Sequence, residues 1–172
     1  MQTVSDSNFG PLIAYLVPGA TVLLGLSQLS PTIATWFAAE PTTPPTIGGF
    51  LYLTLASFAA GMTVSAVRWV VVDTMHAWTG LPMPRLDFSD LGRNVTALSL
   101  LIEIHYRHYL WFSNELVALA IAYGCYRVNL GVTAEVGWLD ALFVLLEGVF
   151  FAASRDTMTK FHVRSHQLLS HS

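Results

Sequence analysis

Four polar residues in the second half of the chain lie where an apolar environment is expected. Asn114 and Glu115 interrupt one long apolar stretch, and Asp140 and Glu147 interrupt the next, with no Lys or Arg inside either stretch. Asp140 and Glu147 are seven residues apart and therefore share a helix face. Carboxyl groups at membrane depth are costly and normally face a bundle interior or water. These four residues predict a pathway for cations or protons. In the alternative, Asp140 and Glu115 are interfacial and a protonated Glu147 bonds to a neighbouring helix.

The segment Glu103–Trp111 (EIHYRHYLW) combines basic and aromatic side chains at high density. Arg together with stacking aromatic rings is the combination that binds the phosphates and bases of nucleotides or single-stranded oligonucleotides. We therefore predict a cytoplasmic ligand site. Its candidate residues are Arg85, Arg93, His105, Tyr106, Arg107, His108, Tyr109, Trp111, Lys160 and Arg164. The alternative is an i,i+4 ion pair of Glu103 with Arg107, an aromatic belt, and basic residues that bind anionic lipid headgroups.

The histidines suggest a different class of function. Asp73-x-x-His76, His105-x-x-His108 and His162-x-x-x-His166 each fit one helix face, a spacing that metal sites use. A membrane-embedded metal-dependent enzyme that uses Asp73, His76, His105 and His108 is therefore the alternative function. No HExxH or Glu-x-x-His motif accompanies these residues. We expect no metal, no cofactor and no catalytic residue, and a non-catalytic membrane scaffold is the third hypothesis.

Composition determines the kind of protein that holds these residues. The chain has 172 residues, of which 8 are Lys or Arg and 11 are Asp or Glu. Charged residues make up 11% of the sequence and hydrophobic residues 53%, whereas a soluble domain has about 25% charged residues. So few charges do not cover the surface of a soluble fold of this size. The single cysteine, Cys125, excludes an internal disulfide and a cysteine-based zinc site. We predict an integral membrane protein.

The apolar stretches predict an all-α fold with four membrane spans in one membrane domain, residues 1–172. A span needs about 20 apolar residues. The expected spans are residues 11–29, 47–72, 109–126 and 136–153. Ser57, Gly61 and Ser65 recur every four residues in the second span and predict a close helix contact. Residues 73–108 form a cytoplasmic segment. It begins with a polar connector, and from about Asn94 one long helix continues into the third span and ends near Tyr126. Residues 154–172 form an amphipathic tail on the membrane or on a neighbouring subunit.

The distribution of basic residues predicts the orientation. Seven of the eight Lys and Arg lie in the middle segment, its flanks or the tail, and only Arg127 lies on the other side. Basic residues concentrate in cytoplasmic loops. An even number of spans agrees with this split, so the N-terminus, the middle segment and the tail are all expected in the cytoplasm. We predict a multi-pass protein of a bacterial inner membrane.

Four spans are few for a pore within one subunit, so we expect a homo-oligomer with a conduit on the shared axis. The leading hypothesis is a gated ion channel or pore-forming effector that a cytoplasmic ligand controls. The layout resembles the small membrane effectors of bacterial anti-phage operons and is similar to the channel subunit of the Hailong system. That resemblance matches no motif and carries over no residue. It implies a role in antiviral defence and a homotetrameric channel held closed by a DNA oligomer, which a partner nucleotidyltransferase makes.

Overall fold

In the computed structural model, every regular element in the described part of the chain is a helix, which confirms the all-α prediction. The structure describes residues 6–37, 47–81, 84, 86 and 91–170. The elements in chain order are α1 (Asp6–Ser27), α2 (Pro31–Phe37), α3 (Ile47–Trp78), α4 (Leu91–Leu101), the π-helical turn η1 (Ile102–Tyr106), α5 (Arg107–Leu130) and α6 (Trp138–Ser170).

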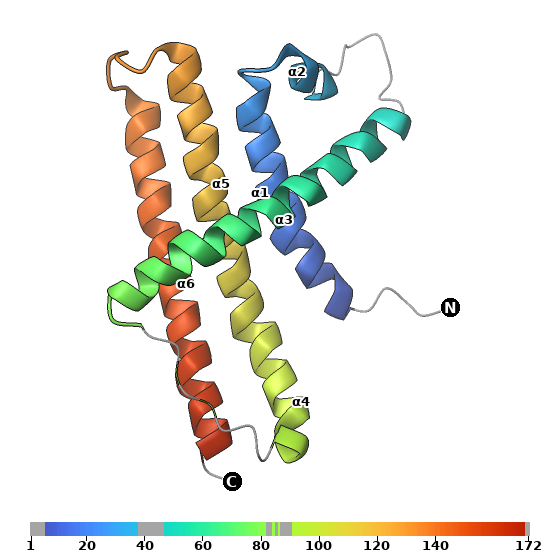
Figure 1. Cartoon of the computed structure of the whole chain (residues 1–172), viewed down its shortest axis with the longest axis vertical. Coiled ribbons are helices and arrows are strands. Elements are labelled where there is room, and N and C mark those ends of the chain that lie inside the picture. Colours follow the sequence, from blue (N-terminus) through green and yellow to red (C-terminus); the bar gives the residue numbers. More distant parts are fainter. Residues whose placement is uncertain (1–5, 38–46, 82–83, 85, 87–90, 171–172) are drawn as a thin grey trace.

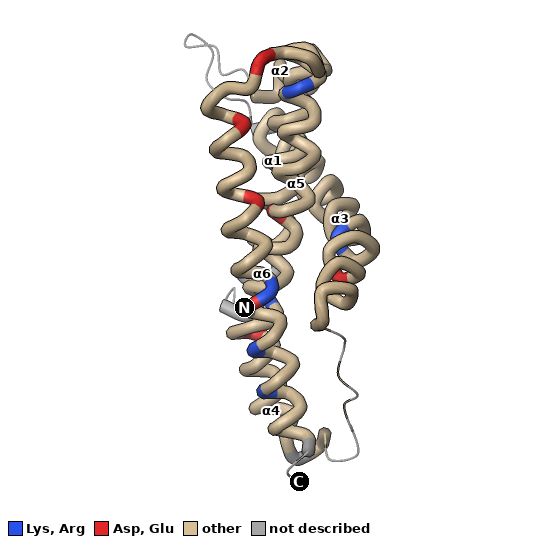
Figure 2. Tube along the Cα trace, turned by 90° about the vertical axis from the view of Figure 1, so that its left-hand side faces the viewer, with Lys and Arg blue, Asp and Glu red and all other residues tan. Residues whose placement is uncertain are grey.

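Three long helices lie side by side and the fourth crosses them. Figure 1 shows α1, α5 and α6 roughly aligned, with α3 running obliquely across one face of the three. The view turned by 90° in Figure 2 places α3 alone on that face. Helix α1 packs against both α3 and α5, and α5 packs against α6. The short α2 and the α5–α6 loop lie at one end of the molecule, and α4 lies with the end of α6 at the other (Figure 1).

Helices α4, η1 and α5 follow one another without a break from Leu91 to Leu130, which confirms the prediction of one long helix. The structure adds a π-helical turn at Ile102–Tyr106, where the Arg107 amide bonds to the Ile102 carbonyl. Such turns are rare and frequently lie at functional sites. This one falls inside the segment that the sequence marked as unusual.

Backbone-to-backbone contact holds α3 against α1. A Cβ atom added at Gly61 would overlap the backbone of Tyr15, and one added at Gly19 would overlap the backbone of Ser57. The predicted small-residue face of α3 therefore makes a close contact, and its partner is α1. Farther along α1, Gly25 packs in the same way against Ala122 of α5.

The polarity of the fold is inverted relative to a soluble protein. Among the described residues, the buried polar or charged side chains are as numerous as the buried apolar ones. The apolar cluster is small: it centres on Val22, Val64, Val72, Val117 and Ala118. Large apolar side chains instead cover the exterior, and Phe50, Tyr52, Trp69 and Trp78 on α3 are each about 70% exposed or more. An exterior of this kind marks contact with lipid or with other chains.

One described helix, from Gly49 to Trp78, is long and apolar enough to cross a membrane, and Ile13–Ser27 is a shorter apolar stretch. Only 17% of the most apolar part of the long helix is buried, unlike the core helix of a soluble protein. The helices α5 and α6 carry polar side chains within their apolar stretches. The expected spans 109–126 and 136–153 therefore stay predictions. Helix α3 itself continues to Trp78, so residues 73–78 are helical, and the end of the second span at residue 72 stays a prediction.

The tail predicted from residue 154 is helical and continues α6, which runs unbroken from Trp138 to Ser170. Ser165 and Leu169 in this part are buried. The Nδ2 atom of Asn94 in α4 lies 3.4 Å from the Leu168 carbonyl oxygen. One face of this helix therefore packs on α4 and η1 of the same chain, and its placement on a membrane or on a neighbouring subunit stays a prediction.

The α1–α3 contact gives a test of the fold with the same substitution at two sites. We expect Gly61→Ala to lower the thermal unfolding temperature and to destabilise the protein by about 1–3 kcal/mol, because the added methyl group forces the two backbones apart. Gly124→Ala is the matched control, since nothing lies within 4 Å of a Cβ at Gly124. Circular dichroism melts in detergent would compare the two. Equal melting temperatures for both variants would contradict the close contact.

Candidate functional site

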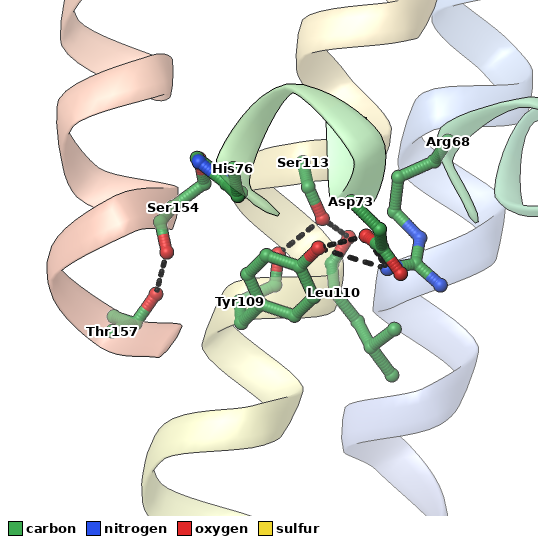
Figure 3. A network of polar contacts seen from close by, with 8 residues as sticks. All are labelled: Arg68, Asp73, His76, Tyr109, Leu110, Ser113, Ser154 and Thr157. Carbon is green, nitrogen blue, oxygen red and sulfur yellow. Dashed lines mark hydrogen bonds and ion pairs between the residues drawn. The ribbon is translucent and has the colours of Figure 1, made fainter. Parts of the chain in front are cut away.

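A side chain of α5 bonds to both members of an ion pair that forms within α3. The Nη1 atom of Arg68 lies 2.9 Å from Asp73 Oδ1 and 3.1 Å from the Tyr109 hydroxyl. That hydroxyl in turn donates to Asp73 Oδ1. Arg68 and Tyr109 are buried, and the guanidinium also lies over the Tyr109 ring, 5.3 Å from its centre. Figure 3 shows the three side chains converging between α3 and α5.

His76, two turns after Arg68, carries the polar contacts from α3 to α6. Its Nε2 atom lies 3.0 Å from Ser154 Oγ, and Ser154 Oγ donates its own proton to the Phe151 carbonyl. His76 must therefore donate from Nε2, which leaves Nδ1 as an acceptor. That Nδ1 atom is buried and has no hydrogen-bond partner among the described residues. Buried polar atoms without a partner are uncommon and call for a functional or structural reason.

The adjacent predicted pathway residues Asn114 and Glu115 are both buried and turn toward α1. Asn114 Nδ2 donates to the Ala14 carbonyl at 3.0 Å. Thr21 Oγ1 lies 3.3 Å from Glu115 Oε2 and 3.1 Å from the Val17 carbonyl. A single hydroxyl proton serves one of these acceptors at a time, so a protonated Glu115 completes the set by donating to Thr21. Glu115 Oε1 is buried and without a partner.

Glu147 lies on the inner face of α6 at the level of Glu115. Phe143 and Phe150, one turn to either side on the same face, contact Tyr123 and Trp111 of the antiparallel α5. Continuing that register between the two contacts places Glu147 level with Glu115. Glu147 Oε1 is buried and has no partner among the described residues. The structure thus brings the two carboxyl groups to one level, with no basic residue bonded to either.

Asp140 has a different environment, because a basic residue from outside the two apolar stretches pairs with it. Arg127 Nη1 lies 3.1 Å from Asp140 Oδ1, and the Tyr123 hydroxyl donates to the same oxygen at 2.5 Å. The Gly137 amide donates to Oδ2 at 2.5 Å, at the start of α6. The loop after α5 folds back, so Asp140 at the start of α6 lies beside Arg127 near the end of α5. Asp140 therefore links α6 to α5 at the end of the hairpin that carries their loop, and it stabilises the beginning of α6.

The polar side chains of α6 form a continuous row on its inner face, which we call the polar seam. It consists of Asp140, Glu147, Ser154 and His162, all at least partly buried against α5 or α3. Residues 140 to 162 span about 33 Å at 1.5 Å per residue, close to the roughly 30 Å hydrocarbon thickness of a bilayer. Figure 2 shows acidic positions along α6 toward the α2 end, and basic positions mostly toward the α4 end.

The predicted ligand residues divide between two faces of the long helix. Most of the aromatic rings pack on protein: Tyr106 contacts Tyr109 and Phe161, and Trp111 contacts Phe112 and Phe150. These rings are not arranged as a platform for bases. Arg107 and His108, together with Trp111, line a cavity of about 390 Å³ against α1.

The basic members of the predicted ligand set are also spread out. His105 is buried and its Nε2 atom lies 2.5 Å from Arg164 Nη1 on α6. Lys160 pairs with Asp156 on the exposed face of α6. Arg85 and the side chain of Arg93 lie outside the described residues. The described part of the set therefore does not converge on one ligand.

The metal-enzyme alternative finds no support in the described residues, which contain no group of three or more His, Cys, Asp or Glu placed to hold a metal ion. Asp73 and His76 bond to Arg68, Tyr109 and Ser154 instead. His105 bonds to Arg164 on a different helix.

Sequence reasoning overlooked the importance of Arg68, Ser154 and Tyr123. The charge of Arg68 inside a long apolar helix was the available signal, since an ionisable residue there requires a partner. The sequence also shows Asp73 five residues after Arg68. Ser154 gave no signal, because only the fold brings it to His76.

No protein-family model matches this chain, and neither a curated protein nor a solved structure shows significant similarity to it.

The Arg68 interactions predict a non-additive pair of mutations. We expect Arg68→Met to destabilise the protein by about 3 kcal/mol, because Asp73 is left without its counter-charge; this is the low end for a buried pair, since Asp73 is partly exposed. Adding Asp73→Leu should recover part of that loss. Chemical denaturation of both single variants and the double variant in detergent gives the coupling. Simple additivity would show that the ion pair contributes nothing.

The His105–Arg164 contact predicts sensitivity to pH. Burial lowers the pKa of His105, and the cations Arg164, Lys160 and His108 lower it further, while Asp156 opposes them. The folded state therefore resists protonation more than the unfolded state, whose histidine pKa is about 6.5. The stability of the contact is complete above that pH and falls as the pH drops through it. Nearby, burial also lowers the pKa of His162, whereas Asp73 raises it.

We expect amide-exchange protection of residues 158–170 to fall between about pH 7 and pH 5. His105→Gln should remove most of that fall, because an amide oxygen accepts from Arg164 without titrating. His166→Gln, at an exposed position of α6, is the control. An undiminished fall in His105→Gln would refute the role of His105.

Proposed function

We propose that this protein is a four-span integral membrane protein that conducts protons along the polar seam between α5 and α6. Glu147 carries the proton at the central level of the seam, and Glu115 of α5, which contacts Thr21 of α1, is a second proton carrier at that level. The proposal keeps the predicted bacterial inner-membrane location, with both termini in the cytoplasm. It also retains ion conduction as the activity, and it narrows the ion to the proton.

The inverted polarity supports the membrane location. The outer face of α6 carries Val144, Leu145 and Val149, which are 55–68% exposed, whereas its inner face carries the polar seam. A helix in lipid turns its polar groups toward its neighbours in this way, because unpaired polar groups in hydrocarbon cost several kcal/mol.

The observation that carries the proposal is the pair of carboxyl groups at one level, Glu115, which is buried, and Glu147, which is partly buried. Each has an enclosed oxygen without a partner among the described residues, and neither forms an ion pair there. A carboxyl group so placed is least costly when protonated, and water that approaches it lowers the cost of the charged form, so the proton is released only when water enters.

Protons fit this geometry better than metal cations. The Tyr123–Phe143 rings stack at 3.9 Å on one side of the two carboxyl groups, and Trp111 meets Phe150 edge-on at 5.7 Å on the other side. A hard cation such as Ca²⁺ requires six or more oxygen ligands and an open route. A proton requires only hydrogen-bonded groups and transient water.

The seam lies inside a single chain. Conduction along it therefore does not depend on a conduit shared between copies, which was the arrangement expected from the small size of the protein. A homo-oligomer would bring together several such chains, each with its own seam.

Proton flux into liposomes tests the function. We expect wild-type protein to collapse an imposed pH gradient and Glu147→Gln to reduce the rate by about tenfold or more, because general acid–base groups contribute on that scale. Glu115→Gln should act in the same direction. Glu135→Gln, an exposed acid in the α5–α6 loop, is the matched control and should leave the rate unchanged.

Two results would overturn the proposal. One is wild-type protein that leaves the gradient intact in every lipid tested. The other is equal flux in wild type and in the double variant Glu115→Gln/Glu147→Gln, with circular dichroism confirming that both are folded.

A further inference from the structure

The cavity between α1 and the start of α5 combines an apolar wall with a compact polar edge. Its volume is about 390 Å³, and it is lined by Ile13 and Ala14 of α1, Glu103 of η1, and Arg107, His108 and Trp111 of α5. This volume lies within the range of ordinary small-molecule sites, roughly 300–1,000 Å³.

The polar edge presents both charges next to each other. Arg107 Nη1 lies 2.8 Å from Glu103 Oε1, across one helical turn. These two side chains are partly exposed, so their charges remain accessible from the cavity side. The lining therefore has no net charge when His108 is neutral. An ion pair of this kind matches a ligand that carries a positive and a negative group close together.

One further polar group lies beside the ion pair. His108 uses Nδ1 for a 2.7 Å bond to the Ile104 carbonyl and must donate there, which leaves Nε2 available to a ligand. The indole nitrogen of Trp111 is closed to solvent, so Trp111 contributes apolar ring surface to the cavity wall and not its N–H group.

We propose that this cavity binds one zwitterionic phospholipid. Its phosphate lies at Arg107, its ammonium group lies at Glu103, and the upper part of an acyl chain lies along Ile13, Ala14 and the Trp111 ring. The proposal rests on the membrane location proposed above and not on proton conduction. In that location the cavity lies where the cytoplasmic part of the long helix enters the membrane, at the depth of lipid headgroups.

A nucleotide fits the same cavity less well. Its base requires a free aromatic face, and the Trp111 ring already contacts Phe112 and Phe150. The rings of Tyr106 and Tyr109 pack elsewhere. A lipid with a net negative headgroup is also disfavoured, because Glu103 lies beside the only lining guanidinium.

Native mass spectrometry of the full chain tests the proposal, with dioleoyl phosphatidylethanolamine and dioleoyl phosphatidylglycerol added to the detergent in turn. We expect one tightly retained phosphatidylethanolamine and about tenfold weaker retention of phosphatidylglycerol, the scale of one charge-assisted hydrogen bond. Arg107→Gln should weaken phosphatidylethanolamine to the same extent. Trp111→Phe, which keeps an aromatic wall of smaller area, should weaken it less.

Two variants separate ligand contacts from general damage. Lys160→Gln removes the corresponding i,i+4 ion pair on the exposed face of α6 and should leave lipid retention unchanged. The charge swap Glu103→Arg/Arg107→Glu keeps an ion pair at the cavity and should retain more lipid than Arg107→Gln.

Equal retention of both lipids, retention unaffected by Arg107→Gln, or displacement of the lipid by ATP would each overturn the proposal. The readout needs no proton flux, so a protein that binds the lipid without conducting protons would contradict only the proposed function. A protein that conducts protons without retaining the lipid would contradict only this inference.

Discussion

A buried guanidinium in an apolar helix requires hydrogen-bond acceptors, so the helix must pack where acceptors are available. Arg68 imposes this constraint on α3. Its two acceptors are Asp73, on the same helix, and the Tyr109 hydroxyl on α5. The second contact fixes how far α3 can slide across α5. With that position fixed, the last turns of α3 reach α6, where His76 meets Ser154 and Thr79 accepts two bonds from Arg155.

The close α1–α3 contact makes this arrangement feasible. Gly61 lets the α3 backbone rest on α1, so α3 lies near enough to α5 for Arg68 to reach Tyr109. Few apolar side chains are buried between these helices, and shape and hydrogen bonding therefore contribute more than hydrophobic burial. This balance is the one expected in lipid, where burying apolar surface gains little and close packing with satisfied polar groups holds helices together.

Features that depend on one helix were predictable from the sequence, and features that depend on two were not. The near-absence of breaking residues predicted one long helix from about Asn94 to Tyr126, which the structure extends to Leu91–Leu130, and spacing predicted the shared face of Asp140 and Glu147. The spacing of Ser57 and Gly61 predicted a close contact without naming α1 as its partner. The pairing of Asp140 with Arg127 depends on how the loop folds back, and the use of Tyr106 in packing depends on where α6 places Phe161. Neither is encoded in local spacing.

The spacing of the polar seam residues along α6 constrains how a proton moves between them. Successive polar residues of the seam are seven or eight apart, about 10–12 Å, which exceeds the length of any hydrogen bond. Water or side-chain movement must therefore bridge each interval, and the ring contacts of Phe143 and Phe150 lie in the two intervals on either side of Glu147. Opening them requires α6 to shift relative to α5. The C-terminal half of α6 is held by the bonds of Arg155 to Thr79 and of Arg164 to His105, so these two contacts resist such a shift. Under the proposed function, control of conduction therefore belongs at that end of the protein.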